Sequence, residues 1–258
     1  MAYVSSIDGI EIYYEVVGDG EVTLIPISGW GAQTSAEHWK YQLSFSSDYK
    51  LVLIDLPGHG KSGNTRETYT MQSYGQDVKS IVERLSLENL ILIGHSMGGA
   101  AILEAAKLLS SRILGLIMVE SLADNLYVRM ETAEIKEFLN PFEENFERTF
   151  LNLLESMLSD KFNPQDVNQL KNSIPHLDKR SLISALTELC KWDMNDVLPE
   201  ITRPIKCICA GRRFPPEMRD VYNRVFDAVY IEEVGHLLIY EDPSRFNKVF
   251  SELIEDIK

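Results

Sequence analysis

The fold of this chain is decided by the stretch Asn89-Leu90-Ile91-Leu92-Ile93-Gly94-His95-Ser96-Met97-Gly98-Gly99-Ala100-Ala101. Its apolar run, residues 90–93, predicts a buried strand, and residues 99–109 predict a helix rich in alanine and leucine. The turn between them has the pattern G-x-S-x-G, which in the order strand, turn, helix indicates a nucleophile elbow. Ser96 is therefore expected at the carboxyl end of a central strand. It would lie beside a helix N-terminus, whose free N–H groups favour a developing negative charge.

Short apolar strands alternate with helical segments on both sides of this stretch. Strands are predicted at residues 22–27, 51–54, 113–119, 205–210 and 229–232, after a hairpin around Asp8-Gly9. Helices are predicted at residues 39–45, 71–85 and 243–257. Asp242 is the expected N-cap of the last helix, and Pro243 its first residue. This alternation predicts an α/β fold with a doubly wound, mostly parallel sheet.

The pattern changes between Glu120 and Pro204. This region has helical spacing of apolar residues without a strand signal, and prolines interrupt it. We therefore predict a helical cap, residues 121–203, inserted into a core made of residues 1–120 and 204–258. Seven apolar side chains of the cap are candidates both for its own core and for a pocket wall: Phe138, Phe142, Phe146, Phe150, Leu154, Met157 and Trp192.

Composition limits the classes of partner. The chain has 258 residues and a net charge of −14, which disfavours binding to nucleic acid or to an anionic membrane surface. We expect a small-molecule substrate, no nucleic-acid or membrane partner, and a monomer or homodimer. The odd cysteine count, with Cys207 and Cys209 in an apolar run, favours thiols in a reducing compartment. No signal peptide or long apolar span is visible, so a cytoplasmic protein is expected.

Three further motifs join the elbow and give a resemblance to a known family. They are Ser28-Gly29-Trp30-Gly31, Asp55-Leu56-Pro57-Gly58-His59-Gly60-Lys61-Ser62, and Gly235-His236 followed by Glu241-Asp242-Pro243. With them the sequence resembles, over nearly its whole length, an α/β-hydrolase-fold protein that carries a cap. In that family the nucleophile, the acid and the histidine follow one another along the chain.

The resemblance assigns roles to a serine and a histidine. Ser96 is implied as the nucleophile, and His236, in Val-Gly-His after a predicted strand, as the base that removes its proton. His59, in the Pro-Gly-His-Gly loop, is interpreted as structural, and His95, directly before Ser96, as packed in the elbow. His38 and His176 are interpreted as surface or cap residues.

The acid departs from the common pattern of the family. Many members carry an aspartate in G-x-x-D after the strand that follows the cap, but here Phe214 occupies that position. A subset of the family takes the acid from the end of the strand after the nucleophile helix, where this chain has Glu120. Neighbouring parallel strands lie about 5 Å apart, so Glu120 is within reach of the imidazole. Glu120 is the candidate acid, with Glu217 and Asp124 as alternatives and a serine–histidine dyad as the remaining possibility.

The oxyanion hole is implied to consist of the backbone N–H groups of Trp30 and Met97. The predicted function is that of a carboxylesterase-like serine hydrolase, which cleaves a small or medium ester through an acyl-enzyme without a metal or organic cofactor. Three alternatives stay open: a C–C bond hydrolase, a cofactor-free haloperoxidase-like enzyme, and a ligand-binding or receptor-like protein on a hydrolase scaffold.

Overall fold

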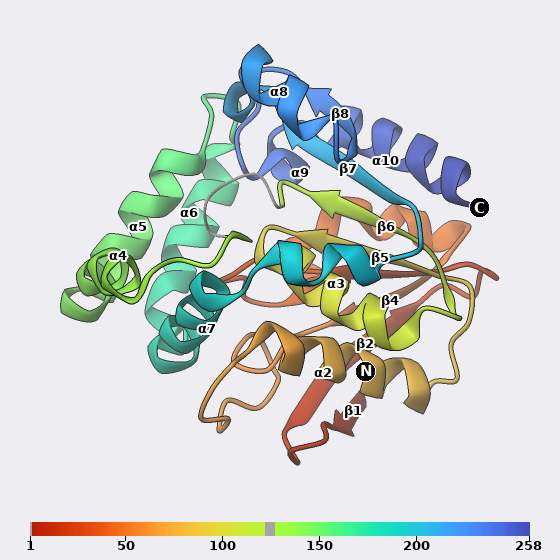
Figure 1. Cartoon of the computed structure of the whole chain (residues 1–258), viewed down its shortest axis with the longest axis horizontal. Helices are drawn as coiled ribbons and strands as arrows, with labels where there is room; N and C mark the ends of the chain where they lie inside the picture. The colour runs from red at the N-terminus through yellow and green to blue at the C-terminus, as the bar shows by residue number, and fades with distance from the viewer. Residues whose placement is uncertain (1, 122–126) are drawn as a thin grey trace.

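An eight-stranded sheet forms the centre of the computed structural model, which describes residues 2–121 and 127–258 (Figure 1). The strands are β1 (Ala2–Ser5), β2 (Glu11–Val17), β3 (Thr23–Ile27), β4 (Lys50–Ile54), β5 (Leu90–His95), β6 (Ile113–Val119), β7 (Ile205–Ala210) and β8 (Asp227–Ile231). Their order across the sheet is β1-β2-β4-β3-β5-β6-β7-β8. β2 is antiparallel to both of its neighbours, and the other pairs are parallel. The predicted mostly parallel sheet is thus confirmed.

Helices cover both faces of this sheet. On one face lie α2 (Met71–Arg84) and α3 (Met97–Leu109), and on the other α1 (Ser35–His38), α9 (Leu238–Glu241) and α10 (Pro243–Ile257). Residues of β5 alternate between the two layers: Leu90 and Leu92 pack with α2 and α3, whereas Ile91 and Ile93 pack with α10. Because β5 is buried on both faces, its sequence is an unbroken apolar run.

The turn from β5 into α3 requires glycine on either side of Ser96. A Cβ atom added to Gly94 would lie 2.5 Å from the carbonyl oxygen of Gly98. One added to Gly98 would lie 2.6 Å from the carbonyl oxygen of Ile27. Side chains at these positions would force the strand and the helix apart, so the two glycines permit the sharp turn.

The chain between β6 and β7 is largely helical and is called the helical insertion below. It consists of α4 (Thr132–Glu144), α5 (Phe146–Met157), α6 (Pro164–Ser173), η3 (Ile174–His176), α7 (Lys179–Lys191), η4 (Met194–Asp196) and η5 (Leu198–Glu200). Figure 1 shows α4 to α7, in green to teal, grouped together at one side of the sheet. The predicted helical character is confirmed. The predicted boundaries at residues 121 and 203 remain predictions.

Several short elements differ from the sequence-based expectation. Residues predicted as a helix at 39–45 form the 3-10 helix η1 (Lys40–Ser47) instead. The hydroxyl of Ser47 donates to the carbonyl oxygen of Ser44, a local bond of the kind that competes with regular helix. The turn η6 (Gly211–Arg213) and the helix α8 (Pro216–Tyr222), both close to the sheet edge that carries the site, were not expected.

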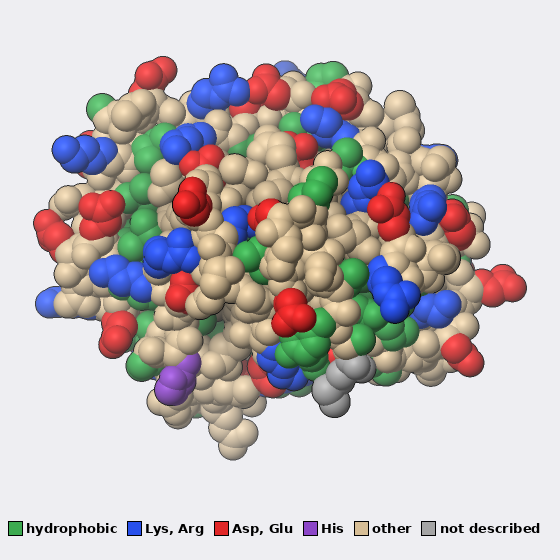
Figure 2. All heavy atoms as spheres, turned by 90° about the horizontal axis from the view of Figure 1, so that it is seen from below, with side chains coloured by type: hydrophobic (Ala, Val, Ile, Leu, Met, Phe, Trp, Pro, Cys, Tyr) green, Lys and Arg blue, Asp and Glu red, His purple; other side chains and the backbone are tan. Residues whose placement is uncertain are grey.

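The surface mixes charges of both signs. On the face drawn in Figure 2, acidic and basic side chains alternate with scattered hydrophobic ones. Among the described residues, no helix combines the length and the apolar character that crossing a membrane requires.

Candidate active site

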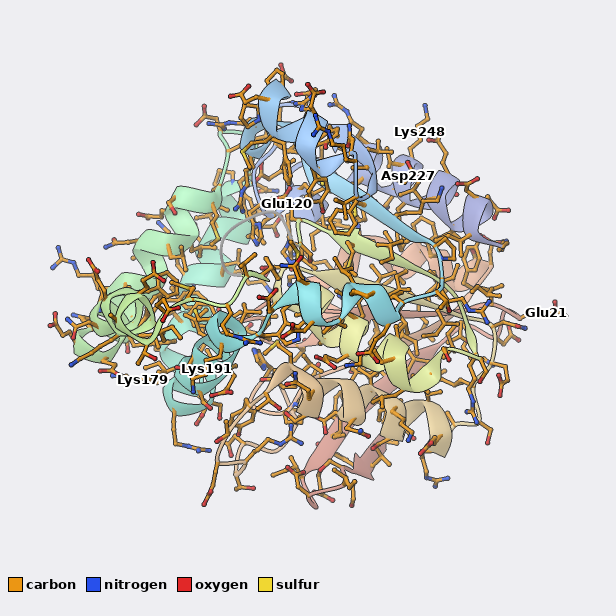
Figure 3. All side chains as sticks on the ribbon, in the orientation of Figure 1. Glu21, Glu120, Lys179, Lys191, Asp227 and Lys248 are labelled. Carbon is orange, nitrogen blue, oxygen red and sulfur yellow. The ribbon has the colours of Figure 1, made fainter. Side chains whose placement is uncertain are left out.

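Three predicted site residues follow strands that end at the same edge of the sheet. Ser96 follows β5, Glu120 follows β6, and His236 lies in the loop after β8. Ser96 and His236 line one cavity of about 460 Å³. In Figure 3, Glu120 lies inside the molecule at the end of β6, whereas Glu21 lies at the far side of the sheet. The edge therefore brings together a hydroxyl, an imidazole and a carboxylate, and the first two face a common space.

Ser96 is held in a backbone conformation that residues other than glycine rarely adopt, with φ of +52°. Its N–H donates to the carbonyl oxygen of Val119 at 2.9 Å, and its own carbonyl oxygen accepts the hydroxyl of Ser121 at 2.7 Å. These bonds fix both sides of the strained residue, whose partly exposed side chain borders the cavity.

The backbone around the predicted oxyanion hole borders the same cavity. Trp30 and Met97 both line it. In the part of the chain that the structure describes, neither of their N–H groups donates to a protein acceptor. The indole of Trp30 donates to the carbonyl oxygen of Leu182 at 2.8 Å, and it also packs against three phenylalanines of the insertion, Phe142, Phe146 and Phe150. The loop after β3 is thus anchored to the helical insertion.

His236 is buried and held at three points. Its Nδ1 lies 3.2 Å from Oε2 of Glu120. Its backbone N–H donates to the carbonyl oxygen of Met157 at 2.9 Å, and its carbonyl oxygen accepts Nε2–H of His95 at 2.9 Å. The ring therefore has a carboxylate on one nitrogen, while the loop that carries it is attached to the helical insertion and to the elbow.

Glu120 is almost fully buried, with 3% of its surface exposed, and its φ is +48°. Its N–H donates to the carbonyl oxygen of Ile208, and its Oε1 accepts the N–H of Ala210 at 2.5 Å. Burial raises the pKa of Glu120 from 4.5 to about 7, although the nearby charge of Arg213 and the Ala210 N–H act in the opposite direction. Both oxygens of the carboxylate are engaged, one by β7 and one by the histidine.

Arg213 contacts the site histidine and was not among the predicted site residues. Its Nη1 lies 2.5 Å from Nδ1 of His236 and 3.4 Å from Oε2 of Glu120. It stands at the end of η6, one position before Phe214, where the family commonly has its acid. Phe214 packs against Tyr222 and Tyr230 with 1% of its surface exposed. The available signal was the pair Arg212-Arg213, which follows Gly211 just after the predicted strand.

The other candidate residues have different places. Glu217 is exposed near the start of α8, and Asp124 lies outside the described residues. His176 is exposed. The interpretation of His38 as a surface or cap residue is wrong, because its side chain is buried and its Nε2 lies 3.2 Å from Nδ1 of His95. Strands and helices remote in sequence enclose His38, and its local sequence carries no signal of this.

The buried histidines other than His236 are neutral at ordinary pH. Burial lowers the pKa of His95 to about 3 and that of His59 to about 4. His59 accepts the N–H of Gly31 at 3.3 Å, and His95 supports the carbonyl oxygen of His236. Both therefore serve as hydrogen-bonding groups around the site, in line with the structural roles predicted for them.

The cavity has mostly apolar walls. Side chains of the helical insertion form much of them, with Tyr127, Arg212 and Arg213 completing the lining. Of the seven predicted wall residues, Phe138 and Met157 line this cavity, and Phe150 and Leu154 line a smaller adjoining one of about 90 Å³. Trp192 points elsewhere and donates to Glu104 at 2.7 Å. No cluster of potential metal ligands occurs among the residues that the structure describes.

Comparison with known proteins agrees with the fold. The family model described as alpha/beta hydrolase fold matches residues 22–243. A non-heme chloroperoxidase from Burkholderia pyrrocinia is 33% identical over 105 residues, which is 40% of this chain and only 37% of that protein. A pimeloyl-[acyl-carrier protein] methyl ester esterase from Hamiltonella defensa is 27% identical over 202 residues, 75% of each chain. An esterase from Exiguobacterium antarcticum has the same fold, with a TM-score of 0.86 and 19% identity over 98% of this chain and 99% of its own.

Proposed function

This chain belongs to the alpha/beta hydrolase fold family, and from that membership we propose that it is a serine hydrolase of small or medium esters. The observation that carries the proposal is the 3.2 Å separation of His236 Nδ1 and Glu120 Oε2 behind a cavity that both His236 and Ser96 line. A carboxylate on the distal nitrogen of an imidazole is the arrangement that makes the imidazole an effective base toward a hydroxyl. Relatives named as esterases agree with this class of reaction.

The proposed reaction proceeds by acyl transfer to water. Ser96 Oγ attacks the carbonyl carbon of the ester while Nε2 of His236 accepts its proton. Glu120 accepts the hydrogen bond from Nδ1–H and stabilises the imidazolium that forms. The oxyanion is bound by the N–H groups of Trp30 and Met97. The loss of one such donor typically costs about 3 kcal/mol in the barrier.

The acyl-enzyme is then hydrolysed by the same groups. The alcohol leaves with the proton held by His236, and a water molecule takes its place. His236 removes a proton from this water as the oxygen attacks the acyl carbon. The acid departs and the proton returns to Ser96 Oγ. Every proton is accounted for by one imidazole, so the proposed cycle needs no metal or organic cofactor.

Cavity size and lining support an ester of moderate length. A volume of about 460 Å³ lies in the lower half of the range usual for small-molecule sites. Phe138, Leu153 and Leu186 contribute apolar wall from three helices of the insertion. An apolar acyl or alcohol group of several carbons fits this environment better than a sugar or a peptide.

A second candidate function is acyl transfer to hydrogen peroxide, which the similarity to a non-heme chloroperoxidase favours. Peroxide would attack the same acyl-enzyme in place of water and release a peracid. Both reactions need the same serine and histidine, so they differ only in the acceptor.

The test uses p-nitrophenyl acetate and p-nitrophenyl butyrate with the wild type and Ser96→Ala. We expect turnover by the wild type and its loss in the variant. Adding hydrogen peroxide to the wild type, with a bromide-dependent dye as the readout, distinguishes the second candidate. A wild type that binds these esters without releasing p-nitrophenol would reject both reactions and favour a ligand-binding protein.

A further inference from the structure

Two side chains, those of Glu120 and Arg213, approach Nδ1 of His236. The proposed mechanism needs only the first of them. The ring nitrogen lies 3.2 Å from Glu120 Oε2 and 2.5 Å from Nη1 of Arg213. The guanidinium in turn lies 3.4 Å from the same carboxylate oxygen. The cation and the anion therefore compete for one nitrogen.

The short contact between Arg213 and His236 determines where the ring proton sits. An arginine keeps all its protons at any ordinary pH, so at 2.5 Å Nδ1 can only accept from the guanidinium. A ring that accepts at Nδ1 carries its proton on Nε2. A base for Ser96 needs the opposite tautomer, with the proton on Nδ1 and the lone pair on Nε2. Arg213, as it stands here, favours the unreactive tautomer.

Arg213 also borders the space that a substrate would occupy. Its side chain is 29% exposed, and it lines the cavity together with its neighbour Arg212. Among the lining residues that the structure describes, there is no aspartate or glutamate. The chain as a whole has a net charge of −14, so the two adjacent arginines give the cavity a local positive charge on an acidic protein. The guanidinium therefore contacts the proposed catalytic pair and also borders the cavity.

We propose that Arg213 makes the enzyme prefer esters that carry an anionic group such as a carboxylate. A carboxylate in the cavity offers the guanidinium a bidentate, charge-assisted partner and draws it away from His236 Nδ1. The ring proton then passes from Nε2 to Nδ1 by exchange with water, with no change in total charge, and Nδ1–H donates to Glu120. The inference rests on the proposed function, serine ester hydrolysis, and Arg213 acts in it as a specificity and positioning residue.

Among the residues that the structure describes, three titratable or charged groups face Glu120 and have to be considered in any pH-dependent test. They are Arg213 from η6, His236 from the loop after β8, and the thiol of Cys209 from β7. Burial raises the pKa of the Cys209 thiol, so this group stays neutral. Because the charge of Arg213 lowers the pKa of Glu120, its removal raises that pKa further above about 7. Variants are therefore compared at about pH 9, where the carboxylate of the wild type is ionised.

The experiment compares two esters with the same leaving group, mono-p-nitrophenyl glutarate as the anionic probe and p-nitrophenyl butyrate as the neutral one. We expect the wild type to have the higher kcat/KM for the glutarate. Arg213→Gln should lower kcat/KM for the glutarate about tenfold or more, the size expected for the loss of a charge-assisted hydrogen bond. It should raise kcat/KM for the butyrate, because the guanidinium no longer favours the unreactive tautomer of His236. Arg213→Lys should recover part of the preference, since it keeps the charge without the planar fork.

The ratio of the two kcat/KM values is measured on one sample, so a partly unfolded variant does not distort it. Arg203→Gln is the charge-matched control, because Arg203 precedes β7 at the end of the strand opposite to the site. An equal loss on both esters in Arg213→Gln would overturn the inference, and so would a wild type without preference for the anionic ester. A wild type that cleaves neither ester would instead count against the proposed function itself.

Discussion

The buried carboxylate of Glu241 accepts the backbone N–H of Gly235 at 2.7 Å, immediately before the site histidine. The same carboxylate accepts the hydroxyl and, at 3.3 Å, the N–H of Ser159, which lies just beyond the end of α5. One side chain thus joins the loop after β8 to the helical insertion. His236 owes its position to this junction as much as to the sheet.

Replacing Glu241 by alanine should therefore weaken both stability and activity. The substitution leaves the Gly235 N–H and the polar groups of Ser159 without their acceptor, at a cost of about 1–3 kcal/mol in the free energy of unfolding. We expect kcat to fall as well, because the His236 loop loses its support. Urea unfolding and ester turnover measure the two effects. Glu252→Ala, an exposed change on α10, is the matched control, and similar behaviour of the two variants would contradict the prediction.

The choice of acid can be tested by comparing Glu120→Gln with Glu217→Gln. The first should lower kcat about a hundredfold or more, because an amide does not stabilise the imidazolium and can favour the wrong tautomer. The second should have little effect, since Glu217 is exposed on α8. Steady-state kinetics on p-nitrophenyl butyrate decide between them. The reverse order would transfer the role to Glu217, and two small effects would indicate a dyad.

The raised pKa of Glu120 also predicts a pH dependence of stability. Between pH 4.5 and about 7 the folded chain keeps a proton on this carboxyl that the unfolded chain releases. The free energy of unfolding therefore falls as the pH rises through this window, by up to roughly 3 kcal/mol from this group. Glu120→Gln has no titrating carboxyl here, so its free energy of unfolding does not fall for this reason. Its stability relative to the wild type, measured by urea unfolding, should increase across the window, and a constant difference would refute the effect.

Ser121 supplies a further test of how the elbow is held. Its hydroxyl donates to the carbonyl oxygen of Ser96 at 2.7 Å and has two more carbonyl oxygens within 3.2 Å. Ser121→Ala should lower the free energy of unfolding by about 1 kcal/mol and reduce kcat, because the strained turn loses a tether. Ser80→Ala removes a hydroxyl that bonds within α2 and should leave kcat unchanged. Thermal unfolding and turnover of the two variants provide the comparison.

Much of the fold follows from the sequence because its signals are local. Strands β6 and β7 have the predicted bounds, because a strand buried on both faces is apolar throughout. Helix α10 has them too, because Asp242 and Pro243 mark its beginning. The Asp242 side chain does accept the N–H of Arg245. By contrast, the spacing of apolar residues at 39–45 predicted a helix but did not show that it would be the 3-10 helix η1.

The candidate site also has a part that the sequence predicts and a part that it does not. Ser96 and Glu120 lie at one edge because both follow parallel strands, and His236 joins them from the loop after β8; the sequence predicted the parallel strands, and the resemblance to the hydrolase family implied the residues. The contact of Arg213 with His236 does not, because it joins two loops through side-chain conformations that only the packed structure defines. The burial of His38 against His95 was missed for the same reason.

The bond from the backbone of His236 to the carbonyl oxygen of Met157 has a consequence for engineering this protein. Exchange of the segment between β6 and β7 with that of a relative is an obvious way to change what the enzyme accepts. Here the exchange would also change the support of His236, the proposed general base, so selectivity and turnover would change together. A graft that ends before residue 157 would keep the two properties separable.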